Sequence, residues 1–142
     1  MTEKLNTQID KAALLRTFEK DYFAKSVGLE IVEIGQGFAR VRVRVNQQHL
    51  NALGKTHGAA LFAAADFALA VASNSYGEAA VATNVTISYI KASTEGSVLE
   101  AVATEESRTR RTGLYRIEIR DELGQKLALA HGSVYLLGQS IL

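Results

Sequence analysis

The run from Ala59 to Ala72 constrains the fold most strongly, because only Asp66 among its fourteen residues is not hydrophobic. A helix needs about 20 apolar residues to cross a bilayer, whereas a run of about 10–14 is more often a buried core helix. The run is hydrophobic on every side of a helical wheel, which is typical of a helix enclosed on all sides. Eight of the fourteen residues are alanine, so other elements can approach its backbone closely. We therefore expect a central buried helix that stops at Asn74, Ser75 and Gly77.

The remaining sequence is mostly β-rich. From Phe38 to Asn46 valine and arginine alternate, which predicts a strand with one buried face. Four further runs of this kind follow the helix and are separated by turn sequences: Val81–Lys91, Val98–Glu105, Gly113–Arg120 and Lys126–Leu137. Successive strands with short turns predict an antiparallel sheet, and the apolar helix must lie in its concave face.

An amphipathic stretch between Ile9 and Phe23 predicts one short helix at the edge of the sheet. The expected fold class is therefore α+β: a long central apolar helix wrapped by a curved antiparallel sheet, with an extra N-terminal helix. We expect a single domain over residues 1–142, in which residues 1–27 form an N-terminal helical extension. Such a sheet exposes strand edges, and dimerisation is one way of covering them.

Composition excludes several classes of protein. The chain has 16 Lys and Arg against 15 Asp and Glu, and this near-balance argues against nucleic-acid binding. It has no cysteine, hence no disulfide, no thiolate metal site and no nucleophilic thiol, and its three histidines are not at metal-ligand spacing. The polar, mixed-charge start is not a secretory signal. We expect a cytoplasmic protein with neither a metal nor a membrane partner.

The main anomaly is Asp66. A carboxylate within a buried helix costs free energy unless it is paired or hydrogen-bonded. One interpretation is structural: Asp66 accepts a hydrogen bond from a neighbouring strand or faces a wet gap. The other is functional: Asp66 is a general base or a nucleophile in a cleft.

The start of the helix, Thr56-His57-Gly58-Ala59, is a second candidate site. The first N–H groups of a helix have no intrahelical partner, and the helix dipole makes that end partly positive. A glycine there lets a ligand carbonyl approach the N–H of Gly58, which is how an oxyanion site forms without side chains. Taken alone this signal is weak, because His-Gly at a helix start more often serves only capping and turn geometry. In the preceding loop, Asn51 either orients a water or a carbonyl, or makes ordinary loop hydrogen bonds.

Spacing limits how these two candidates can act together. Gly58 and Asp66 are separated by about 12 Å along a straight helix. A nucleophile and an oxyanion donor must both lie within about 3–3.5 Å of one reacting carbonyl. If both serve one reaction, Gly58 of one chain must face Asp66 of a second chain across a two-fold axis.

The motif also resembles that of a known family. The stretch His49-Leu50-Asn51-x-x-Gly54-x-x-His57-Gly58-Ala59, followed by Leu61 and Asp66, is similar to the helix motif of hotdog-fold acyl-CoA thioesterases, and most of all to the PaaI-like (phenylacetic acid degradation) branch. Further matches are Asn74, Val81-Ala82-Thr83 and Arg110-Arg111-Thr112-Gly113-x-Tyr115, so the resemblance runs from about Gly28 to Leu137. One departure is Ala59, where the family usually has a second glycine; its methyl group narrows the space beside the thioester.

The resemblance implies a mechanism. Gly58 would polarise the thioester carbonyl through its N–H, and Asp66 of the partner subunit would act as general base or as nucleophile. Asn51 would help to place the carbonyl or the water, and Thr83 would hydrogen-bond the attacking water. His57 would orient the helix start rather than transfer protons. No cofactor is implied, because CoA is part of the substrate.

The phosphates of CoA call for cations. Lys91, Arg108, Arg110 and Arg111 lie at predicted strand ends or turns, from which they could reach a pantetheine-phosphate tail across a subunit boundary; the alternative is a solvated charged surface. The family habit implies a homotetramer built from two dimers.

Two other functions compete with hydrolysis. The same fold can bind acyl-CoA as a non-catalytic sensor or serve only in assembly, which would leave Asp66 without a task. Hotdog hydratases and dehydratases use a His and an acid together, whereas His57 and Asp66 lie on opposite sides of the predicted helix. The acyl group is not specified by the sequence, although an aryl or a medium chain is one expectation. Phe62, Phe67, Tyr76 and Tyr89 could line an aryl pocket, but aromatic residues at these spacings are more often ordinary core residues.

Overall fold

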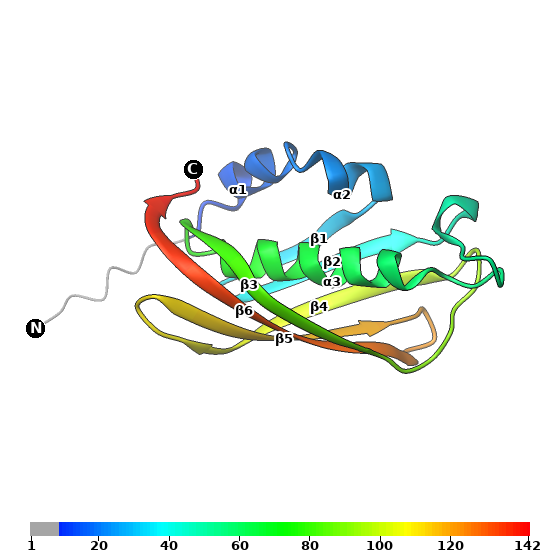
Figure 1. Cartoon of the computed structure of the whole chain (residues 1–142). Coiled ribbons are helices and arrows are strands. Elements are labelled where there is room, and N and C mark those ends of the chain that lie inside the picture. The colour runs from blue at the N-terminus through cyan, green and yellow to red at the C-terminus, as the bar shows by residue number, and fades with distance from the viewer. Residues whose placement is uncertain (1–8) are drawn as a thin grey trace, which may run out of the picture.

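The computed structural model describes residues 9–142 and consists of a helix wrapped by one curved sheet (Figure 1). All neighbouring strands are antiparallel, in the order β1-β2-β4-β5-β6-β3. The elements are α1 (Lys11–Phe18), α2 (Tyr22–Val27), β1 (Glu30–Gly35), β2 (Phe38–Arg44), a 3-10 turn (Gln47–His49), α3 (Gly58–Ser73), β3 (Glu78–Tyr89), β4 (Val98–Arg108), β5 (Thr112–Arg120) and β6 (Lys126–Ser140). The predicted α+β architecture, a long central helix wrapped by a curved antiparallel sheet, is confirmed.

The long helix α3 packs closely on the sheet because most of its contact residues are small. Ala64, Ala65 and Ala68 are almost completely buried. On β6, a Cβ at Gly132 would lie only 2.5 Å from the side chain of Leu69, so the strand passes the helix at a point where only glycine fits without rearrangement. The alanine-rich sequence therefore sets the distance between helix and sheet.

The helix is not enclosed on all sides, which corrects the prediction from its composition. Ala59, Phe62 and Asp66 are exposed in the single chain and follow one another at helical spacing along one stripe. The sheet curls around one side of α3, and the N-terminal helices cover another part (Figure 1). A stripe of α3 therefore remains uncovered, with the acid in it.

The N-terminal region forms two helices rather than the single helix predicted. Asp10 caps α1 and Asp21 caps α2, each by accepting a hydrogen bond from a backbone N–H of the first turn. The helices pack over α3 beside the edge strand β1, with Phe18 edge-to-face against Phe67 at 6.0 Å between ring centroids. Residues 1–8 of the predicted extension lie outside the described residues.

Strands β1 and β3 form the two edges of the sheet. Residues 81–84 of β3 are all exposed, although strand residues point alternately to opposite faces. A long exposed edge strand of this kind is normally covered by another element or another chain. Within residues 9–142, no helix is long and hydrophobic enough to cross a bilayer.

Candidate active site

His57 caps the N-terminus of α3. Its backbone is extended, with φ −63° and ψ 138°, and its Nδ1 accepts a hydrogen bond of 2.9 Å from the N–H of Ala59. The N–H of the intervening Gly58 has no hydrogen-bond acceptor within residues 9–142. An unpartnered N–H at the positive end of a helix is suited to an anionic or carbonyl oxygen. Because the Nδ1 of His57 serves as the cap, its position fits the orienting role suggested by the sequence.

The loop before α3 is held together by Asn51. Its Oδ1 accepts hydrogen bonds from the N–H groups of Leu53, at 2.9 Å, and Lys55, at 3.1 Å. The backbone N–H of Asn51 donates to the carbonyl of Lys55 at 2.7 Å. The ordinary loop role is thus observed, and only the NH₂ group of Asn51 is left to donate to a ligand.

His49 joins this loop to the N-terminal helices. Its Nδ1 accepts from the N–H of Asn46 at 3.0 Å, so Nε2 carries the proton and donates to the carbonyl of Val27 at 2.6 Å. His131 lies separately, on β6. Among the residues that the structure describes, no group of three or more His, Asp or Glu side chains could hold a metal ion.

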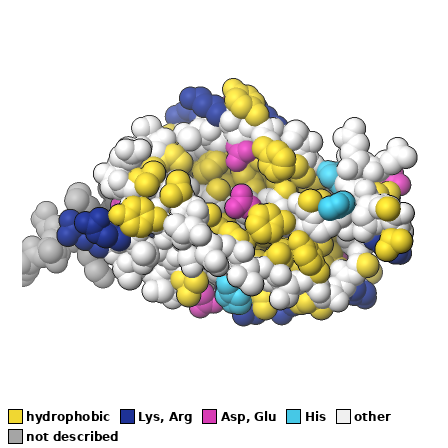
Figure 2. All heavy atoms as spheres, in the orientation of Figure 1, with side chains coloured by type: hydrophobic (Ala, Val, Ile, Leu, Met, Phe, Trp, Pro, Cys, Tyr) yellow, Lys and Arg dark blue, Asp and Glu magenta, His cyan; other side chains and the backbone are white. Residues whose placement is uncertain are grey.

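Asp66 lies in the uncovered stripe of α3, where its carboxyl group is accessible to solvent. No hydrogen bond or ion pair from residues 9–142 reaches it, so the expected bond from a neighbouring strand is not found. Figure 2 shows acidic side chains set among hydrophobic ones at the centre of this face. Partial shielding by the surrounding atoms raises the pKa of Asp66, and the negative charge of Asp21 raises it further.

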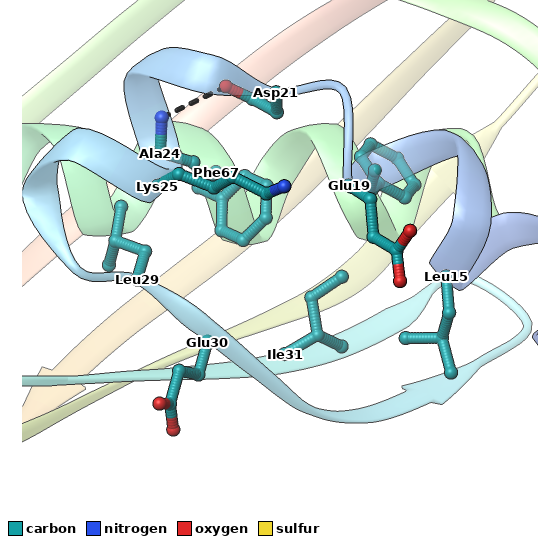
Figure 3. Close-up of a pocket in the computed structure, with 10 residues that line it drawn as sticks. Leu15, Glu19, Asp21, Ala24, Lys25, Leu29, Glu30, Ile31 and Phe67 are labelled. Atoms are coloured by element: carbon teal, nitrogen blue, oxygen red, sulfur yellow. Dashed lines mark hydrogen bonds between the residues drawn. The ribbon is translucent and has the colours of Figure 1, made fainter.

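A groove lies beside this stripe, between the N-terminal helices, β1 and α3 (Figure 3). Its volume is about 330 Å³, and hydrophobic side chains, among them Phe18, Ile31 and Phe67, form much of its lining. Asp21 also lines it. Sequence reasoning missed Asp21 as part of the site, because nothing in its local sequence distinguishes it from an ordinary helix cap.

Gly58 and Asp66 lie two helical turns apart on α3, so one chain cannot bring them to the same atom.

Thr83 lies on the exposed edge strand β3, next to an irregularity in the pairing with β6. Its hydroxyl donates to the carbonyl of Ser133 at 3.2 Å. At the far end of β3, the hydroxyl of Tyr89 donates to the carbonyl of Gly58 at 3.1 Å.

The four predicted CoA-binding cations are not brought together within one chain. Lys91 follows β3 and hydrogen-bonds Gln125. Arg108, the last residue of β4, forms an ion pair of 3.8 Å with Glu78, the first residue of β3. It therefore lies near the end of β3 that is opposite to Lys91. Arg111 donates to the hydroxyl of Tyr135 at 3.2 Å, and Arg110 precedes it in the turn between β4 and β5. Arg111 lies near Val81, the β3 partner of Tyr135, so most of the length of β3 separates Lys91 from the arginines.

Comparison with known proteins shows the family of this chain. The model of the thioesterase superfamily matches residues 53–128. A protein of Escherichia coli named acyl-coenzyme A thioesterase PaaI is 38% identical over 124 residues, covering 87% of this chain and 89% of that protein.

Solved structures show the same similarity. The E. coli PaaI protein from the phenylacetic acid degradation operon superposes with a TM-score of 0.86 at 36% identity, covering 89% of this chain and 91% of that one. A hypothetical thioesterase of Streptococcus pneumoniae, solved with coenzyme A, gives a TM-score of 0.81 at 25% identity, covering 87% and 98%. The chain therefore belongs to the thioesterase superfamily, as a PaaI-like thioester hydrolase with the hotdog fold.

Proposed function

We propose that this chain hydrolyses an acyl-CoA thioester to a free acid and CoA, in a site that two copies of the chain share. One observation carries the proposal: α3 presents both an unpartnered N–H, at Gly58, and an exposed carboxylate, Asp66, which lies two turns further along the helix. The names of the relatives support the substrate class, since one is an acyl-CoA thioesterase and another was solved with coenzyme A.

In this mechanism the Gly58 N–H receives the thioester oxygen. Hydrogen bonding at the positive end of α3 polarises the carbonyl and stabilises the negative charge that develops as the carbon becomes tetrahedral. The site needs little general-acid help at the sulfur, because the CoA thiolate is a good leaving group.

Asp66 of the partner subunit either activates water to attack the carbonyl carbon or attacks that carbon itself. As a general base it removes a proton from water, the water oxygen bonds to the carbonyl carbon, and the carbon–sulfur bond then breaks. The proton held on Asp66 passes to the departing thiolate. As a nucleophile, the carboxylate itself displaces the thiolate to give an anhydride, which water then hydrolyses. The raised pKa of Asp66 makes its carboxylate a stronger proton acceptor and a stronger nucleophile, so it suits both routes.

The remaining residues position the reactants. The NH₂ group of Asn51 donates to the carbonyl or the water, and the Thr83 hydroxyl bonds the attacking water. His57 caps α3 and takes no proton. The acyl group that we expect is aryl or medium-chain, because Phe62 lies beside Asp66 in the uncovered stripe and presents an apolar surface. No cofactor is required.

The assembly that this mechanism requires is a homodimer, and we propose a homotetramer made of two such dimers. The exposed edge of β3 and the uncovered stripe of α3 provide surface for a second copy. Lys91, Arg108, Arg110 and Arg111 bind the CoA phosphates. Since Lys91 lies far from the three arginines within one chain, a phosphate held by both groups lies between copies.

The test is release of free thiol from short, long and aromatic acyl-CoAs by the wild type and by Asp66→Ala. We expect hydrolysis by the wild type and at least about a 10²-fold loss of turnover in the variant, which is the scale of a positioned base. Unchanged oligomer size and unfolding midpoint serve as controls for folding. Binding of CoA without thiol release from any substrate would contradict the proposal and favour a sensor.

A further inference from the structure

Tyr89, the last residue of β3, lies directly over the first residue of α3. Its hydroxyl donates to the carbonyl of Gly58 at 3.1 Å. A Cβ at Gly58 would lie 3.1 Å from the Cζ atom of the ring and 3.2 Å from the hydroxyl oxygen. The aromatic ring therefore occupies the space that any larger side chain at position 58 would need.

Burial does not explain this contact. Tyr89 is 54% exposed in the single chain, so its ring is not part of the hydrophobic core. The chain that follows Tyr89 is nevertheless fastened to the same helix start. The hydroxyl of Ser93 donates to that of Thr56 at 2.6 Å, and the N–H of Thr56 donates to the carbonyl of Ser93 at 3.0 Å. Three hydrogen bonds thus join residues 89–93 to residues 56–58.

The bond to Gly58 acts on the first turn of α3. The His57 carbonyl accepts the first bonds of the helix, from the N–H groups of Ala60 and Leu61. The Gly58 carbonyl is the next acceptor along the helix, and the phenol of Tyr89 is a second donor to it. Two donors hold the Gly58–Ala59 peptide in place, and the Tyr89 ring lies against the Cα of Gly58. The N–H of Gly58 belongs to the preceding His57–Gly58 peptide, which is joined to the held peptide at that Cα. Fixing the Cα and the carbonyl therefore limits the directions in which the N–H can point. An oxyanion donor acts only when its direction is fixed, because a misplacement of about 1 Å can lower a rate about 10²-fold.

We infer that Tyr89 is a positioning residue of the thioesterase site: its hydroxyl and ring together fix Gly58 in the orientation in which the N–H can bind the thioester oxygen. The inference rests on the proposed function, because it assigns that N–H to the substrate. It adds a second residue of the edge strand β3, besides Thr83, to a site built mainly from α3 and the preceding loop.

The first test separates the hydroxyl from the ring. Tyr89→Phe removes the hydrogen bond to Gly58 and keeps the ring in place. We expect kcat to fall about 3- to 10-fold, the scale of one neutral hydrogen bond, while KM stays within about twofold. The matched control is Tyr76→Phe, which removes a phenol hydrogen bond of 3.0 Å to Glu105 beyond the other end of α3. We expect Tyr76→Phe to keep the wild-type kcat.

The second test uses the steric contact. Gly58→Ala keeps the N–H but adds a Cβ that meets the ring, so we expect a loss of at least about tenfold in kcat. In a Tyr89→Ala background the ring is gone, and the same substitution should change kcat by less than about twofold. The unfolding free energies of the four chains should show the same non-additivity, which gives a readout that does not depend on activity.

The outcomes separate this inference from the proposed function. If the wild type hydrolyses acyl-CoA and Asp66→Ala does not, the proposed function stands. Tyr89→Phe with full kcat, or equal losses from Gly58→Ala in both backgrounds, would then overturn the positioning role alone. Absence of hydrolysis by the wild type would contradict both.

Discussion

Gly58 and Asp66 lie on the same helix, about 12 Å apart along its axis, one at the end that the helix dipole makes positive and the other in the uncovered stripe. Each is open to a ligand, and neither can serve the other within one chain. A two-fold axis that sets two such helices side by side brings the N–H of one to the carboxylate of the other. The following predictions depend on this relationship.

Replacing Asp66 with asparagine should stabilise the fold at neutral pH. The surroundings raise the pKa of Asp66 in the folded chain, so folding favours the protonated carboxyl and opposes its ionisation. This stabilising preference is complete below the ordinary pKa of an aspartate and is lost as the pH rises through the folded value. A neutral carboxamide carries no such penalty. Urea unfolding should therefore give Asp66→Asn the higher unfolding free energy at pH 7, with the difference shrinking in acid. A difference independent of pH would show that the carboxyl is not perturbed.

The charge of Asp21 should set the acid limb of the pH–rate profile. Asp21→Asn removes a negative charge that raises the pKa of Asp66, yet asparagine still caps α2. The rise of kcat/KM with pH should therefore shift to lower pH. Asp10→Asn is the matched control, because Asp10 caps α1 in the same way. Equal profiles for the two variants would rule out a specific interaction between Asp21 and Asp66.

His57 should be replaceable by another capping residue. Asparagine accepts the hydrogen bond that the imidazole accepts from Ala59, so His57→Asn should keep kcat within about threefold of the wild type. His57→Ala loses the cap and should lower the unfolding free energy by about 1 kcal/mol. Thermal unfolding and thiol release measure the two effects. A loss in His57→Asn as large as that in Asp66→Ala would identify the imidazole as a proton carrier.

The arginines of the β4–β5 turn should act on the nucleotide end of the substrate. Arg110→Ala and Arg111→Ala should each raise KM for an acyl-CoA about 3- to 10-fold, because each removes a charged donor to phosphate. KM for the matching acyl-pantetheine, which lacks the nucleotide, should not change. Arg44→Ala, on the solvent side of β2, is the control. Equal effects on both substrates would place these arginines outside the CoA site.

Local patterns predicted much of this fold. The alternation in β2 correctly placed Val41 and Val43 in the core, where both are almost completely buried. The apolar run from Ala59 to Ala72 correctly predicted α3. Gly58 at its start and Asn74 at its end predicted where the helix begins and stops. Such features depend on residues close together in the sequence, which is why they could be identified without coordinates.

The corrections concern contacts that no local pattern encodes. The exposure of Asp66 depends on how far the sheet curls around α3, which the hydrophobicity of the helix does not reveal. Tyr89 and Gly58 are distant in sequence and meet only because β3 runs back along α3. Asp21 reads as a helix cap, and only the packing of α2 over α3 brings its charge to Asp66.

Mixing two inactive chains tests the shared site most directly. Gly58→Pro deletes the N–H, and proline is tolerated at the first position of a helix. The backbone of His57, at φ −63° and ψ 138°, already suits a residue before proline. Gly58→Ala adds a Cβ that meets the Tyr89 ring and keeps the N–H, so it measures the part of the loss that steric contact alone causes.

Each of Gly58→Pro and Asp66→Asn alone should be at least about 10²-fold less active than the wild type. After subunit exchange, confirmed by mass spectrometry of differently tagged chains, half of the dimers are mixed and each holds one intact site. The mixture should then recover about a quarter of the wild-type turnover. Exchanged dimers that are no more active than the two parents would contradict a site made of Gly58 from one chain and Asp66 from the other.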